Sequence, residues 1–121
     1  MQMNEIQFSE GVPVDGYGPG FFRIAGQVVQ GPICLGPTGL CAWRGYDNLD
    51  PLMALADAVD VIFVGTGAEI AFLPDPVRQC LEKASFGVEP MSSPAACRTY
   101  NVLLSEGRRV ALAALPVATG G

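Results

Sequence analysis

Apolar residues form short clusters separated by glycine and proline in the first half of the chain. These clusters occupy residues 21–30, 33–35 and 40–43, and the stretch 36–39 combines glycine with proline. Short apolar segments bounded by turn-forming residues are typical of β-strands. We therefore predict a small β-meander of three strands, preceded by a mostly extended loop at residues 1–20.

Extended and helical patterns alternate in the second half. The continuous apolar run Val61–Val64 predicts a strand covered on both faces, and residues 88–91 and 109–115 predict two further strands. Residues 75–86 carry apolar side chains at helical spacing, and a longer helical pattern covers residues 92–106. The order strand–helix–strand–helix–strand, with right-handed crossovers, predicts a largely parallel sheet covered by helices.

Each predicted helix starts with a capping side chain followed by a proline. Asp50-Pro51 opens a short helix to about residue 58, Asp75-Pro76 opens a second that ends at Gly87, and Ser92-Ser93-Pro94 opens a third that ends at Gly107. Together these signals predict a compact three-layer α/β fold. We expect one domain over residues 1–121, with a frayed tail at 117–121.

Composition limits the classes of function. Half of the 121 residues are apolar and the mean hydropathy is +0.33, so either the core is large or a partner, which includes a second copy of the chain, covers apolar surface. The net charge is −5 and Lys83 is the only lysine, which argues against binding to nucleic acid or to an anionic membrane. The first residues do not resemble a signal peptide, and no apolar run approaches the ~20 residues of a transmembrane helix. We therefore expect a cytoplasmic protein that does not insert into the membrane.

Cysteine and histidine usage argues against the common metal sites. The four cysteines, at positions 34, 41, 80 and 97, form no C-x-x-C pair, and the chain has no histidine to complete a zinc site. The carboxylates show no metal-ligand spacing. We expect four reduced, mostly buried thiols, and neither a metal nor another cofactor.

Two loops that follow neighbouring strands of the predicted sheet form the first candidate site. Gly65-Thr66-Gly67 ends one strand and Ser92-Ser93-Pro94 ends the next. Ligands of such sheets bind at the carboxyl ends of the strands, where backbone N–H groups and helix N-termini can hold an anion. Gly65-Thr66-Gly67 is also explained as a tight strand exit with a capping threonine, because it lacks a dinucleotide or P-loop fingerprint.

The start of the third predicted helix carries a second candidate cluster, which consists of Cys97, Arg98, Thr99, Tyr100 and Asn101. An arginine near the positive end of the helix dipole suggests an anionic ligand, and Cys97 beside it would have a lowered pKa and could act as a nucleophile. Without histidine, the base would have to be a carboxylate. In the alternative interpretation Cys97 packs inward and Arg98 pairs with a carboxylate such as Asp75 or Glu106.

These residues belong to a longer pattern that resembles a known family. The pattern consists of Tyr17-Gly18, Phe22-Arg23-Ile24, Trp43, Gly65-Thr66-Gly67, residues 95–104 (AACRTYNVLL) and residues 106–110 (EGRRV). It resembles the Mth938-like domain family of small proteins of unknown function, whose eukaryotic members include mitochondrial complex I assembly factor 3 and an adipogenesis-associated protein. The resemblance covers about residues 5–116 and implies a compact three-layer α/β domain without an established catalytic activity.

The resemblance implies a function in assembly through protein contacts. The mitochondrial relative assists the assembly of respiratory complex I, and bacterial members are often encoded near protein-export genes, so the implied partners are subunits of membrane complexes or of the export machinery. Relatives usually carry Asp-Thr-Gly where this chain has Ser92-Ser93-Pro94, and the missing carboxylate removes a base near Cys97. We therefore favour a non-catalytic assembly or interaction module. The alternative is a protein, or an enzyme, that binds a small anion or another small molecule at Gly65–Gly67, Cys97 and Arg98.

Overall fold

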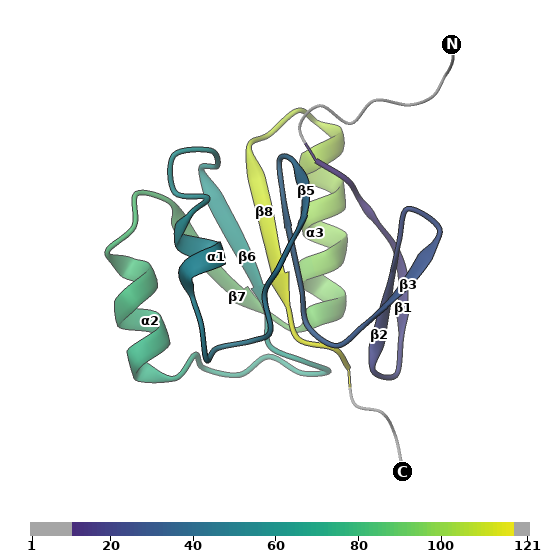
Figure 1. Cartoon of the computed structure of the whole chain (residues 1–121), viewed down its shortest axis with the longest axis horizontal. Helices are drawn as coiled ribbons and strands as arrows, with labels where there is room; N and C mark the ends of the chain where they lie inside the picture. The colour runs from purple at the N-terminus through teal and green to yellow at the C-terminus, as the bar shows by residue number, and fades with distance from the viewer. Residues whose placement is uncertain (1–10, 118–121) are drawn as a thin grey trace.

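The chain folds into two β-sheets and three helices, which the computed structural model describes for residues 11–117 (Figure 1). The smaller sheet contains β1 (Val14–Gly18), β2 (Phe21–Ile24) and β3 (Gln27–Gln30), paired antiparallel in that order. It confirms that the first third of the chain contains a β-meander. The meander is formed by residues 14–30, whereas the sequence predicts it over residues 21–43.

The larger sheet is mixed and forms the centre of the molecule. Its strands lie in the order β5 (Gly39–Cys41), β4 (Ile33–Gly36), β8 (Val110–Ala114), β6 (Val61–Gly65) and β7 (Gly87–Met91). β6 is parallel to both β7 and β8, whereas β4 runs antiparallel to β5 and β8. The parallel half is therefore confirmed, and the strands predicted near residues 33 and 40 belong to this sheet rather than to the meander.

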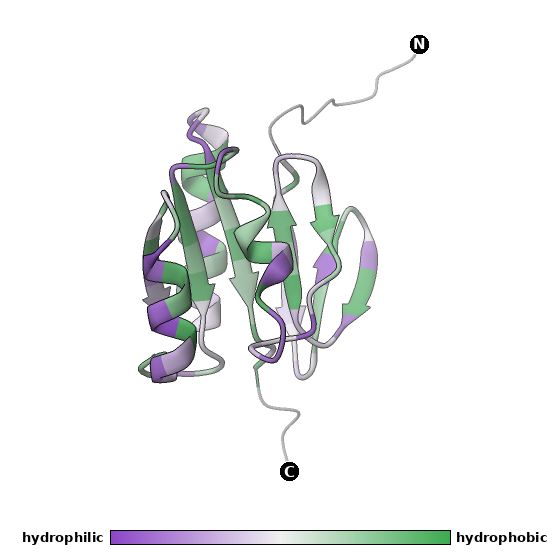
Figure 2. Cartoon of the chain, turned by 60° about the vertical axis from the view of Figure 1, so that its left-hand side comes forward, coloured by the Kyte–Doolittle hydropathy of each residue, from purple (hydrophilic) through white to green (hydrophobic). Residues whose placement is uncertain are grey.

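Helices cover both faces of the larger sheet. They are α1 (Asp50–Met53) and α2 (Asp75–Glu82) on one face and α3 (Ser93–Ser105) on the other (Figure 1). In β8, Ala111 and Ala113 belong to the core under α1 and α2, and the alternate residue Leu112 packs in the core that contains Tyr100 of α3. Figure 2 shows the hydrophobic residues along the strands of this sheet. The arrangement confirms the three-layer α/β prediction.

The segment predicted as a single strand, residues 21–30, is a β-hairpin in the structure. Residues 21–30 form β2 and β3, which pair through a turn at Ala25-Gly26. Both turn residues have positive φ, 53° at Ala25 and 78° at Gly26, which suits a two-residue turn between twisted strands. The prediction of a single strand is wrong because alanine gives no turn signal. The loop predicted for residues 1–20 is also wrong at Val14–Gly18, where β1 pairs with β2.

The helix starts agree only partly with the sequence signals. Ser92 caps α3 as predicted, since its hydroxyl oxygen accepts a hydrogen bond from the N–H of Ala95. Asp50 and Asp75 instead lie inside the first turns of α1 and α2, and neither helix has a side-chain capping hydrogen bond. Both of these helices end earlier than predicted, so Gly87 begins β7 rather than ending α2.

The C-terminal end of the described chain is hydrogen-bonded to the turn between β1 and β2. The C=O of Val117, the first residue of the predicted frayed tail, accepts a hydrogen bond of 3.1 Å from the N–H of Gly20. The predictions for residues 1–10 and 118–121 lie outside the described residues. Within residues 11–117, no helix combines the length and the apolar composition that crossing a membrane requires.

Candidate functional site

The two loops predicted at the strand ends meet in the structure. They follow β6 and β7, which pair in parallel. The N–H of Gly67 donates to Oγ of Ser93 (2.9 Å), and the N–H of Ser93 donates to the C=O of Gly67 (2.7 Å). The N–H of Thr66 donates to the C=O of Met91 at 2.8 Å. The N–H groups of Thr66 and Gly67, which were candidates for holding an anion, are therefore bonded to the neighbouring loop.

Ser93 and Gly65 form a tightly packed junction between α3 and the central sheet. Ser93 is 1% exposed, and its hydroxyl donates to the C=O of Leu115 while it accepts from Gly67. A Cβ added at Gly65 would lie 2.6 Å from Oγ of Ser93 and 3.0 Å from Cβ of Ala114. This geometry agrees with the interpretation of the stretch as a tight strand exit.

Thr66 organises the loop that leads from β6 to α2. Its hydroxyl lies 2.8 Å from the C=O of Glu69 and 3.0 Å from the C=O of Met91. The same oxygen accepts a hydrogen bond of 3.0 Å from the N–H of Ala71. These contacts fix the path of the loop across the end of the sheet.

Three members of the second candidate cluster, Cys97, Arg98 and Asn101, line a shallow hollow between α3 and β1. The hollow has a volume of about 270 Å³. Its lining residues are Val14, Asp15, Gly16, Tyr17, Pro94, Cys97, Arg98, Asn101 and Val102. No residue of the 65–67 or 92–93 stretches is among them. The structure therefore places the two candidate clusters in different environments.

Asn101 ties α3 to β1. Its Oδ1 accepts a hydrogen bond from the N–H of Val14 and its Nδ2 donates to the C=O of the same residue, both at 2.8 Å. The hydroxyl of the adjacent Tyr100 donates to the C=O of Val12 at 2.9 Å. Burial raises the pKa of Tyr100, which keeps this hydroxyl protonated as a donor. The amide of Asn101 is thus engaged within the fold.

The thiol of Cys97 is protonated at neutral pH. The side chain is 4% exposed, and burial raises its pKa to about 11. The prediction of a lowered pKa is wrong, because burial removes water from around the side chain and destabilises the thiolate. Arg98 is exposed. Within residues 11–117 it forms no ion pair, and the predicted partners Asp75 and Glu106 are no exception.

The remaining cysteines are also free thiols. Cys34 is buried, whereas Cys41 and Cys80 are half-buried. Cys34 and Cys41 are partners across the β4–β5 hairpin, and burial together with this neighbour raises the pKa of Cys34. In the described part of the chain, no three side chains of the metal-binding types lie together.

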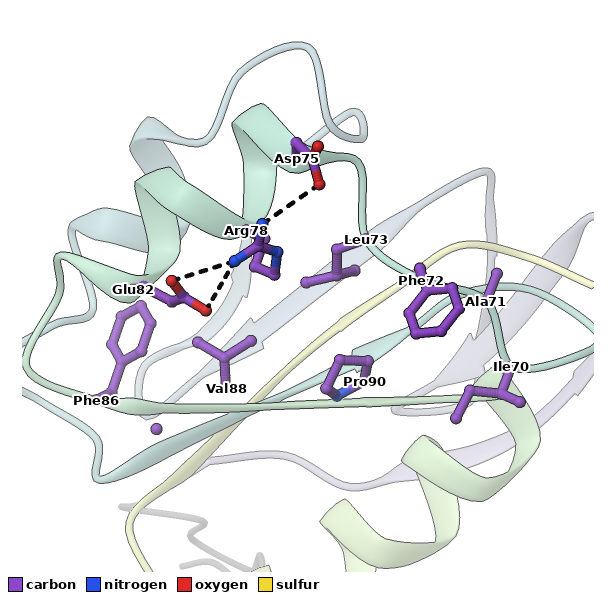
Figure 3. A pocket seen from close by; sticks show the side chains of 11 residues that line it. Ile70, Ala71, Phe72, Leu73, Asp75, Arg78, Glu82, Phe86, Val88 and Pro90 are labelled. Atoms are coloured by element: carbon purple, nitrogen blue, oxygen red, sulfur yellow. Dashed lines mark hydrogen bonds and ion pairs between the residues drawn. The ribbon is translucent and has the colours of Figure 1, made fainter.

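A larger groove, which the sequence analysis missed, lies at the β7 edge of the sheet (Figure 3). It has a volume of about 760 Å³. Its lining residues are Ile70, Ala71, Phe72, Leu73, Asp75, Arg78, Glu82, Phe86, Gly87, Val88 and Pro90. Ile70 and Phe72 are 68% and 101% exposed. The sequence feature that could have revealed the groove is the apolar run Ile70–Leu73 in a loop between a strand and a helix. Surface loops are usually polar, so four consecutive apolar residues in one indicate a binding surface.

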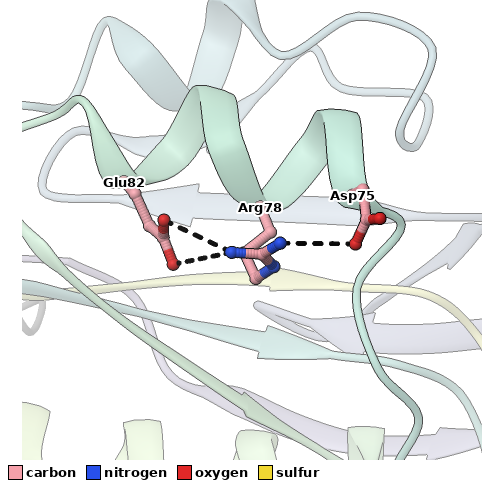
Figure 4. Close-up of polar contacts among 3 residues, drawn as sticks. All are labelled: Asp75, Arg78 and Glu82. Atoms are coloured by element: carbon pink, nitrogen blue, oxygen red, sulfur yellow. Dashed lines mark hydrogen bonds and ion pairs between the residues drawn. The ribbon is translucent and has the colours of Figure 1, made fainter.

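Three charged side chains of α2 border this groove. The guanidinium of Arg78 lies 3.3 Å from Oδ1 of Asp75 and 3.4 Å from Oε2 of Glu82 (Figure 4). Residues three and four positions apart share one side of a helix, so a single arginine reaches both acids. The hydrogen bonds to Asp75 and Glu82 raise the pKa of Arg78. The cluster therefore carries one excess negative charge.

Sequence comparison links the chain to one family. Residues 14–115 match the family described as "Protein of unknown function (DUF498/DUF598)". An uncharacterised protein of Rhodobacter capsulatus is 49% identical over 97% of this chain and 94% of its own length. NADH dehydrogenase (ubiquinone) 1 alpha subcomplex assembly factor 3 of Danio rerio is 32% identical over 93% of this chain and 68% of its own length. The human factor of the same name is 30% identical over 85% of this chain and 60% of its own length.

Solved structures show the same fold. A Bartonella henselae protein, described as an outer membrane protein, has a TM-score of 0.81 and 32% identity, with 92% of this chain and 99% of that chain covered. A Bordetella pertussis protein, described as a Mth938-like domain, has a TM-score of 0.73 and 26% identity, with 98% and 92% covered. These similarities confirm the resemblance found in the sequence.

Proposed function

Because this chain belongs to the DUF498/DUF598 family and has the Mth938-like fold, we propose that it is a non-catalytic assembly module that binds a protein partner. The proposed place of action is the cytoplasm. The proposed partners are subunits of a respiratory membrane complex, with subunits of the export machinery as the second choice.

The observation that carries this proposal is the similarity to assembly factor 3 over 93% of the chain. That relative is named for the assembly of NADH dehydrogenase. The family match runs from residue 14 to residue 115 and so includes both sheets and the three helices that the structure describes. The support is therefore an analogy with a relative that shares the whole domain.

Two features of the structure support a binding role rather than a nucleophilic one. The loop before α2 exposes Ile70 and Phe72 beside an apolar groove, as expected for a surface that a partner covers. The thiol of Cys97, with its pKa of about 11, is a poor nucleophile at neutral pH.

Deletion of the gene in the native host tests the proposal. We expect less assembled NADH dehydrogenase and more of its subcomplexes in native gels of solubilised membranes, with both effects reversed by a plasmid copy. A Cys97→Ala copy is expected to restore assembly as well as the wild type, since the proposed module does not use the thiol. Unchanged amounts of assembled complex in the deletion strain would rule out this function.

The alternative function, binding of a small anion, is supported by one feature of the hollow between α3 and β1. Arg98 is exposed there and forms no ion pair within residues 11–117. A binding role for it predicts that inorganic phosphate raises the melting temperature of the wild type. The idea fails if phosphate has the same effect on the Arg98→Ala variant.

A further inference from the structure

The groove beside β7 has an apolar floor and an exposed aromatic side chain at one end. Val88, Pro90 and Phe86 line the floor, and Phe72 stands at the end formed by the loop before α2 (Figure 3). Phe72 is fully exposed to water in the isolated chain. An exposed aromatic side chain beside an apolar groove is typical of a surface that is covered in a complex, where such residues contribute much of the binding free energy.

β7 is an edge strand, but it is poorly suited to pair with another strand. The N–H of Gly87 and the C=O of Met91 both form hydrogen bonds on the β6 side. Because this direction alternates along a strand, the backbone groups of Val88 and Pro90 face the free edge. Proline has no N–H, so an added strand would find a single donor along β7, at Val88. A partner that binds through side chains fits this edge better than a partner strand.

The charges at the groove favour a basic partner. Asp75 and Glu82 share Arg78, which leaves one negative charge in excess on the α2 side. The whole chain carries a net charge of −5. A second copy of this chain would bring the same acidic cluster to the groove, and repulsion between like charges would oppose its binding.

We propose that this groove binds an amphipathic α-helix of the partner protein. Apolar side chains of that helix would contact Phe72, Val88 and Pro90, and a lysine or arginine on its flank would face Asp75 and Glu82. The inference rests on the proposed function, since an assembly module needs a surface for its partner.

The length of β7 sets the length of the helix. Five residues of strand extend over about 16 Å, which about 11 residues of α-helix match at its rise of about 1.5 Å per residue. A helix of this length presents apolar side chains at positions i, i+4 and i+7 toward a groove.

Selection from a displayed library of helical peptides tests the groove with defined probes. Each peptide is an amphipathic helix of about 18 residues, which exceeds the groove by about two turns. The apolar stripe is varied among Leu, Ile, Met and Phe, and the flank is varied among Lys, Arg, Asp and Glu. Against the full-length chain, we expect binders with an intact stripe at helical spacing and with Lys or Arg on the flank.

Three variants then locate the binding site. Phe72→Ser removes the aromatic anchor and Glu82→Lys reverses the charge, and we expect each to weaken binding of the selected peptides at least about tenfold. Leu40→Ser is the matched control, because Leu40 is 52% exposed on β5, at the opposite edge of the same sheet. We expect it to leave binding unchanged. The altered side chains are exposed, so all three variants are expected to fold, which melting curves check.

Several results would overturn the inference. The first is that the library yields no binders. The second is that the selected peptides bind the Phe72→Ser and Glu82→Lys variants as tightly as the wild type. The third is that the bound peptide forms a strand and protects the N–H of Val88 from hydrogen exchange. Binding of a small apolar dye without binding of any peptide would also overturn it, because the groove would then be a small-molecule site.

Complementation of the deletion strain separates this inference from the proposed function. If the deletion impairs assembly and the Phe72→Ser copy fails to restore it while the Leu40→Ser copy succeeds, both statements are supported. If the Phe72→Ser copy restores assembly fully, the function stands and the groove is excluded as the docking site. If the deletion itself leaves assembly intact, the proposed function fails, whatever the peptides show.

Discussion

At the scale of single residues, burial decides the chemistry that residue type only suggests. A cysteine and an arginine in the first turns of a helix are compatible with an activated thiolate. In the structure Cys97 faces the core and Arg98 faces solvent, as helical spacing allows for adjacent positions. The alternative interpretation is therefore confirmed for the inward packing of Cys97. Its ion pair between Arg98 and Glu106 or Asp75 is not present within residues 11–117.

The reactivity of Cys97 toward iodoacetamide should follow its raised pKa. Below a pKa of about 11 the thiolate fraction, and with it the labelling rate, rises about tenfold per pH unit. We expect slow labelling at pH 7, a steep rise up to about pH 10, and faster labelling of the half-buried Cys80 at neutral pH because it is more accessible. Mass spectrometry of tryptic peptides measures both rates. Fast, selective labelling of Cys97 at pH 7 would restore the nucleophile hypothesis.

At the scale of elements, the sequence predicts strongly patterned segments well and weakly marked turns poorly. The buried strand β6 and the capped helix α3 follow from continuous apolar residues and from Ser92. The hairpin at Ala25 could not be predicted, because its turn depends on a positive φ that alanine rarely adopts. The proximity of the loops after β6 and β7 could be predicted from the topology of the sheet. The hydrogen bonds between the two loops could not, because these bonds depend on the distance between the loops.

The junction between β6 and α3 should tolerate no side chain at Gly65. The added Cβ of Gly65→Ala would lie 2.6 Å from Oγ and 2.9 Å from Cα of Ser93, so we expect a loss of about 2 to 3 kcal/mol in the free energy of unfolding. Gly16→Ala is the control, because a Cβ there meets no atom within 4 Å. We expect this control to change stability by less than about 1 kcal/mol. Urea denaturation measures both values, and equal stabilities of the two variants would contradict the packing argument.

At the scale of the whole molecule, the two most exposed large apolar side chains of residues 11–117, Ile70 and Phe72, lie together beside one edge of the central sheet. Composition alone leaves two alternatives, a large core or apolar surface that a partner covers, and it does not locate such a surface. The groove is assembled from the loop before α2, from α2 itself and from β7, which only the tertiary structure brings together. The sequence motifs predict a site at the start of α3. The exposed Phe72 lies on the opposite side of the sheet, with α2.

Photocrosslinking in living cells tests the central claim, that this protein binds a partner through the groove, most directly. The photoreactive analogue p-benzoylphenylalanine is placed at position 72, where it replaces a fully exposed phenylalanine, and in a control strain at position 40. We predict a crosslink from position 72 to a subunit of a membrane complex, mapped to a basic amphipathic helix of that subunit, and no such crosslink from position 40. The same crosslinks from both positions, or none from position 72 in cells that contain the protein, would contradict the account.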